Sequence, residues 1–168
     1  MMKKYFMLTF AAIVFLVIFT MFYEHFPFID TKPDIILIIV TYIALTSDKT
    51  IDLFLAFSLG YLADLFSGST IGLFTLLRTI TYMFIRAFNV SYFSNNIVFF
   101  GILTFIVSML DAIYLGYRFS LAGGFLSIFF NAIYMSFINL IAAFAVYPIL
   151  QKIEKLYRKT KLETEEMY

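Results

Sequence analysis

Long apolar runs, separated by short polar segments, constrain the fold of this chain more than any other feature. Hydrophobic residues make up 62% of its 168 residues and charged residues 14%, whereas a soluble domain has about 45–50% apolar and about 25% charged residues. A chain of this size cannot hide so much apolar surface from water, so lipid must surround most of it. Because backbone polar groups in lipid must be satisfied within the protein, runs of this length predict helices.

Polar turns divide the chain into six expected membrane spans, so the sequence predicts an all-α membrane protein with a six-helix transmembrane bundle over residues 1–150. The first span is expected to be a retained anchor, since its apolar run exceeds the ~7–15 residues of a signal peptide and no small-residue cleavage site follows. The second and third are short and could instead form one re-entrant hairpin. The expected spans are residues 5–23, 34–46, 51–66, 71–88, 97–117 and 125–150, followed by a charged tail over residues 151–168.

Basic residues at both ends of the chain set the expected orientation. Lys3 and Lys4 precede the first span, and five lysines and arginines follow the sixth. Cytoplasmic segments carry the excess of Lys and Arg, so both termini are expected in the cytoplasm, which requires an even number of spans. In the tail, Lys152, Lys155 and Lys159 fall on one helical face, a pattern that favours contact with anionic lipid.

Three charged residues fall inside the expected spans: Asp64, Arg78 and Asp111. Each costs about 2.5–3.5 kcal/mol at the centre of a span and needs a partner away from lipid. At ~1.5 Å per residue, Arg78 lies about 10 Å and Asp111 about 9 Å below the outer boundary, with Asp64 above them. We expect these three residues to form a polar cluster in the outer half of the bundle, as a structural contact between helices or as a site for a partner or ligand.

Small and amide residues indicate close contacts between helices. Ala56 and Gly60 precede Asp64 by two turns and one turn, so the third span has a narrow face that points Asp64 into the bundle. Polar residues near one stripe of the sixth span predict hydrogen bonds between helices, with a substrate cavity or a partner interface as the alternative: Ser127, Asn131 and Asn139.

A short turn joins the third and fourth spans. Ser67 and Gly68 let the chain reverse in little space, and Gly68 and Gly72 relieve backbone constraints there. Asp64 is expected to cap or brace this turn through backbone N–H groups, with Arg78 as a nearby countercharge.

Several function classes find no support in the sequence. The chain has no cysteine and a net charge of +1, so thiolate chemistry is excluded and there is no electrostatic case for a nucleic-acid partner. Its single histidine, His25, has no second ligand at metal spacing, and no phosphate-binding loop or nucleophile elbow is present. We therefore expect no catalytic residue, no metal and no cofactor, and an enzyme is the least supported of the hypotheses.

The turn between the third and fourth spans resembles the signature of the MreD family of rod shape-determining membrane proteins. Lys32-Pro33-Asp34, followed by an apolar run with Tyr42, also resembles the opening of that family's second span. The signature resides in six residues of the segment GYLADLFSGSTIGL: Gly60, Asp64, Ser67, Gly68, Gly72 and Leu73. The motif extends over about residues 33–78, so Asp111 lies outside it.

The resemblance implies a non-enzymatic protein of the bacterial inner membrane that takes part in cell elongation. Such a protein would bind the single-span protein MreC and lie near RodA and its penicillin-binding transpeptidase. It would help couple cytoplasmic MreB filaments to lateral peptidoglycan synthesis. The family's fold is similar to that of the substrate-binding subunits of energy-coupling-factor transporters, so a vitamin-binding subunit is the alternative.

Overall fold

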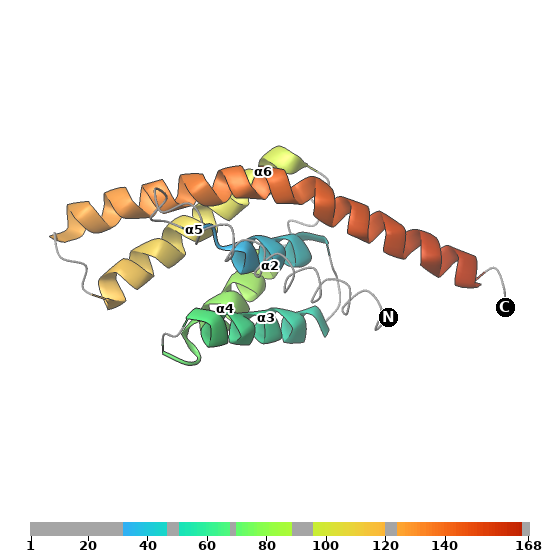
Figure 1. The fold of residues 1–168 in the computed structure, drawn as a ribbon, viewed down its shortest axis with the longest axis horizontal. Coiled ribbons are helices and arrows are strands. Elements are labelled where there is room, and N and C mark those ends of the chain that lie inside the picture. Colours follow the sequence, from blue (N-terminus) through green and yellow to red (C-terminus); the bar gives the residue numbers. More distant parts are fainter. Residues whose placement is uncertain (1–31, 47–50, 68–69, 89–95, 120–123, 166–168) are drawn as a thin grey trace.

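The computed structural model describes residues 32–46, 51–67, 70–88, 96–119 and 124–165, and every regular element in these ranges is an α-helix. This result confirms the all-α prediction for the described residues. The first expected span, residues 5–23, lies outside them. In chain order the helices are α2 (Ile35–Thr46), α3 (Ile51–Ser67), α4 (Leu73–Ala87), α5 (Ile97–Arg118) and α6 (Gly124–Glu165) (Figure 1).

The short helix α2 is the centre of the fold. Its sequence, IILIIVTYIALT, has no polar face, and every residue from Ile35 to Leu45 is buried. A helix that is apolar all round requires burial on all sides. α2 contacts α3, α4, α5 and α6, and Figure 1 shows it between the α3–α4 pair and the α5–α6 pair. At about 18 Å, α2 is shorter than the ~30 Å hydrocarbon core, and its enclosure by protein removes the need to match that thickness.

Three aromatic rings join α2 to the α5–α6 pair. Tyr42 meets Phe100 and Tyr147 edge-on, at centroid distances of 6.0 and 5.9 Å, and Phe100 lies 5.1 Å from Tyr147. All three rings are buried. Edge-to-face aromatic pairs contribute about 0.5–1.5 kcal/mol beyond the burial of their area, so this cluster fixes the rotation of α2 against its neighbours.

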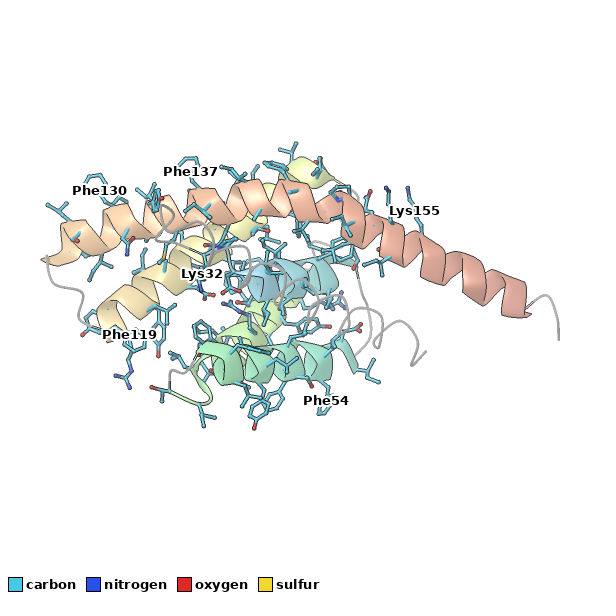
Figure 2. All side chains as sticks on the ribbon, in the orientation of Figure 1. Lys32, Phe54, Phe119, Phe130, Phe137 and Lys155 are labelled. Carbon is cyan, nitrogen blue, oxygen red and sulfur yellow. The ribbon has the colours of Figure 1, made fainter. Side chains whose placement is uncertain are left out.

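The outer surface of the described helices is rich in large apolar side chains. Phe54 on α3 is 70% exposed, and Phe130 and Phe137 on α6 are 67% and 52% exposed. Figure 2 shows Phe54 and the α6 phenylalanines pointing outward on opposite sides of the molecule. By length and composition, two of the described helical stretches could cross a membrane, Ile97–Arg118 and Gly124–Lys155. An apolar exterior of this kind suits lipid and not water.

Helix α6 extends past residue 150, where the sixth span was expected to end, and reaches Glu165. The residues after Pro148 are mostly good helix formers, with no glycine or further proline before Glu165. Figure 1 shows that α6 bends along its length, and Pro148 lies inside it. A proline removes one backbone hydrogen bond and bends a helix without ending it when the flanking turns are stable.

Candidate functional site

A buried arginine joins two carboxylates from different parts of the chain. Arg78 on α4 donates from Nη1 to Oδ2 of Asp111 on α5, and from Nη2 to Oδ2 of Asp34 at 2.5 Å. Arg78 is 0% exposed, which makes it the largest fully buried side chain among the described residues. A guanidinium presents its donors as a rigid planar fork, so one arginine can hold two carboxylates through two different nitrogens, whereas a lysine has a single nitrogen. We call Asp34, Arg78 and Asp111 the charged triad.

Asp34 also organises the start of α2. Its Oδ1 accepts a hydrogen bond from the backbone N–H of Leu37 at 2.8 Å, the geometry of a helix N-cap. Its own N–H donates to Oδ1 of Asn139 on α6 at 2.7 Å, and Nδ2 of Asn139 donates to Oγ of Ser108 on α5 at 2.6 Å. The hydrogen bonds between helices that were predicted for Asn139 are thereby confirmed. Through Asp34 the beginning of α2 is tied to α4, α5 and α6.

Asp64, near the end of α3, binds the beginning of α4. Its Oδ1 accepts from the N–H of Phe74 at 2.8 Å, and its Oδ2 accepts from the N–H groups of Gly72 and Thr75 at 2.9 and 3.0 Å. The Thr75 hydroxyl donates to the same Oδ2 at 2.5 Å. The first turn of a helix has unpaired N–H groups and a partial positive charge, and a carboxylate satisfies both. Asp64 is buried, so this cap is shielded from water.

The structure brings together two of the three residues expected in one cluster. Arg78 and Asp111 are paired, but the second carboxylate on Arg78 is Asp34 and not Asp64. Among the described residues Asp64 forms no ion pair with Arg78, and both of its oxygens accept hydrogen bonds from the start of α4. Sequence reasoning passed over Asp34 because a charge at the end of a span is inexpensive. Its signal was the Pro33-Asp34 pair directly before an apolar run, which is typical of a helix N-cap.

Gly60 allows α3 and α4 to approach each other closely. A Cβ atom added to Gly60 would lie 2.6 Å from the Cα atom of Thr75 and 2.9 Å from the carbonyl oxygen of Phe74. Both contacts are with backbone, which cannot rotate away as the end of a side chain can. Only glycine fits at this point of the α3–α4 contact, as expected for a small residue between packed helices.

The remaining residues of the turn motif surround the Asp64 cap. Gly72 begins α4 with φ at 98°, in the left-handed region, a conformation that glycine adopts at little cost. The Ser67 hydroxyl donates to the carbonyl oxygen of Asp64 at 3.1 Å. Gly68 lies outside the described residues. We call Gly60, Asp64 and Gly72, with the start of α4 that they contact, the α3–α4 corner.

These contacts connect helices in both halves of the chain. The charged triad joins α2, α4 and α5, and the corner joins α3 to α4. Over the described ranges, no group of three or more His, Cys, Asp or Glu side chains is placed to hold a metal ion. The ion pairs and hydrogen bonds of the triad and the corner join helices from different parts of the chain.

Buried charges inside helices with an apolar outer surface define the chain as a helical membrane protein. The family model described as rod shape-determining protein MreD matches residues 1–160, and the chain belongs to this family. The match confirms the resemblance found in the turn motif and extends it over nearly the whole chain. No curated protein and no solved structure matches the chain. Membership gives the chain a role in rod shape determination as a structural membrane protein.

Proposed function

We propose that this protein is a non-enzymatic, multi-pass component of the cell-elongation complex in the bacterial inner membrane. It binds MreC and helps couple MreB filaments to lateral peptidoglycan synthesis by RodA and its penicillin-binding transpeptidase. Its six helices form one transmembrane bundle with both termini in the cytoplasm, similar in fold to the substrate-binding subunits of energy-coupling-factor transporters. The match of residues 1–160 to the MreD family carries this proposal.

The arrangement of polar contacts supports a scaffold role. The charged triad and the α3–α4 corner connect α2 to α4 and α5, and α3 to α4. The same helices present large apolar side chains outward, including Phe54 on α3 and Phe137 on α6. A rigid framework with an apolar exterior offers a surface of constant shape to the membrane span of a partner. The triad and the corner serve in this proposal to maintain that surface.

The vitamin-binding alternative draws no support from a specific observation. A groove of about 500 Å³ between α3 and α4 is open, and most of its lining side chains are apolar, among them Phe57, Tyr61 and Leu76. A site for a polar vitamin is instead enclosed and has several convergent polar groups. The family match also favours the shape-determining role over vitamin uptake.

Affinity purification of the tagged full-length protein from its native membrane in mild detergent, followed by mass spectrometry, tests the proposal. We expect recovery of MreC together with the wall synthases. Asp64→Ala and Arg78→Met should reduce this recovery, whereas Ser58→Ala, which removes a hydroxyl bonded only within its own helix, should leave it unchanged. Recovery of a paired ATPase and a long transmembrane coupling protein would replace the scaffold role with vitamin uptake.

A further inference from the structure

Helix α6 leaves the bundle within a short, well-defined stretch. Leu150 is fully buried, and Ile153 packs partly against the core. Glu154 accepts a hydrogen bond from the hydroxyl of Tyr42 on α2 at 2.6 Å. Lys152 and Lys155 are exposed at this level. Figure 2 places Lys155 where α6 continues past the other labelled helices of Figure 1.

The charges of α6 follow a definite order from this point. Residues 152–161 contain five lysines and arginines against the single acidic residue Glu154, and the acidic residues Glu163 and Glu165 come after them. At ~1.5 Å per residue, the basic stretch extends about 14 Å along the helix. The helix is therefore basic next to the bundle and acidic farther from it.

The apolar run of α6 ends at Leu150, and Gln151, Lys152 and Lys155 follow it closely. The basic residues therefore begin at the level where the helix reaches the lipid headgroups. Electrostatic attraction in physiological salt acts over about 8–10 Å, which is comparable to the length of the basic stretch.

We propose that the basic part of α6, residues 152–161, binds the anionic phospholipid headgroups of the surface from which the helix emerges. Cations next to this surface and carboxylates farther away form the order that a negatively charged plane favours. An acidic surface of a partner protein could bind basic residues at any distance from the bundle. Such a partner therefore does not explain why the basic residues lie next to the bundle and the acidic residues farther from it. The inference concerns lipid alone and is independent of which proteins this chain binds.

The absence of cysteine from the chain allows a direct test on the full-length protein. Thr164→Cys provides a single site for a donor dye, and an acceptor dye is placed on lipid headgroups. The protein is reconstituted in phosphatidylcholine vesicles with and without phosphatidylglycerol. We expect higher energy transfer with phosphatidylglycerol. The increase should disappear as salt is raised from about 0.1 M to about 1 M, because the screening length falls from about 10 to about 3 Å.

A matched pair of variants separates charge from structure. Replacement of all five basic residues by glutamine should abolish the increase that phosphatidylglycerol causes. Exchange of each lysine for arginine, with Arg158→Lys, retains the charge and should retain the increase. Equal energy transfer in the two vesicle types overturns the proposal, and this comparison needs only the labelled parent. Loss of a co-purifying protein in the glutamine variant, without any lipid effect, would also overturn it and assign the stretch to an acidic protein surface.

Discussion

The guanidinium of Arg78 on α4 donates a hydrogen bond from Nη1 to Oδ2 of Asp111 on α5, with Arg78 fully buried. The same side chain holds Asp34 through Nη2. One positive charge thus serves two carboxylates, and each carboxylate depends on it for its only ion pair among the described residues. Loss of the arginine therefore has a larger effect than loss of either aspartate.

Arg78→Met tests this dependence. It leaves the carboxylates of Asp34 and Asp111 beside each other without a cation, and removal of one partner from a buried ion pair costs about 3–5 kcal/mol. Chemical unfolding of the purified protein in detergent, followed by circular dichroism, measures the loss. Arg78→Lys should have a stability between those of the parent and Arg78→Met. It keeps the positive charge but has one nitrogen in place of the two that donate to Asp111 and Asp34. Wild-type stability of Arg78→Met would show that the carboxylates do not need the arginine.

Neutralising the whole triad should cost less than removing its cation alone. In Asp34→Asn/Arg78→Met/Asp111→Asn no unpaired charge remains, and the asparagine at position 34 can still accept the N–H of Leu37. We expect this triple variant to be more stable than Arg78→Met by about 2 kcal/mol, since replacement of a buried ion group by neutral side chains is often tolerated. The same unfolding assay also measures the three single variants. If their losses of stability simply add up to the loss in the triple variant, direct coupling among the three residues is contradicted.

Asp64→Ala should weaken the α3–α4 corner. It leaves the N–H groups of Gly72, Phe74 and Thr75 without their acceptor, and loss of a helix N-cap costs about 0.5–2 kcal/mol. We expect a value near the top of this range because the cap is buried. Asp64→Asn should lose roughly half as much, since it keeps one acceptor but loses the charge at the helix N-terminus. Ser58→Ala, which removes a hydroxyl bonded to the carbonyl oxygen of Phe54 on the same helix, is the control and should be nearly neutral in thermal unfolding.

Much of the fold could be predicted from the sequence, because apolar runs and turn residues act locally. The apolar run after Asp34 predicts a short helix, and α2 is such a helix, although its burial on every side was not expected. The expectation that Asp64 caps the following turn also depends on local chain geometry. It agrees with the hydrogen bonds to Gly72 and Phe74.

The partner of each charge could not be predicted in the same way. The helical rise per residue places Arg78 and Asp111 at the same depth in the membrane. Depth alone does not determine which helices lie side by side. The second carboxylate on Arg78 depends on α2 lying at the centre, next to α4. A lateral arrangement of this kind follows from packing across the whole bundle. The tail of α6 is helical for a different reason, since charged residues with high helix propensity continue a helix that is already nucleated.

Gly60→Ala provides the sharpest test of how closely α3 and α4 must approach. The new methyl group would lie 2.6 Å from the Cα atom of Thr75, so the helices must separate. Overpacking typically costs about 1–3 kcal/mol, and contact with backbone favours the upper end. Gly72→Ala is the matched control, because its Cβ would meet no atom within 4 Å. The left-handed φ at Gly72 should alone cost about 1 kcal/mol.

Unfolding of both variants in the same detergent compares steric contact with backbone conformation directly. Dyes at Ser58→Cys and Thr79→Cys, in a chain that otherwise has no cysteine, report the separation of α3 from α4. We expect Gly60→Ala to be the less stable variant and to increase that separation, while Gly72→Ala leaves it unchanged. Wild-type stability of Gly60→Ala would mean that α3 and α4 can move apart without cost. The contact at Gly60 would then not be what holds the corner, and the Asp64 cap would have to maintain it alone.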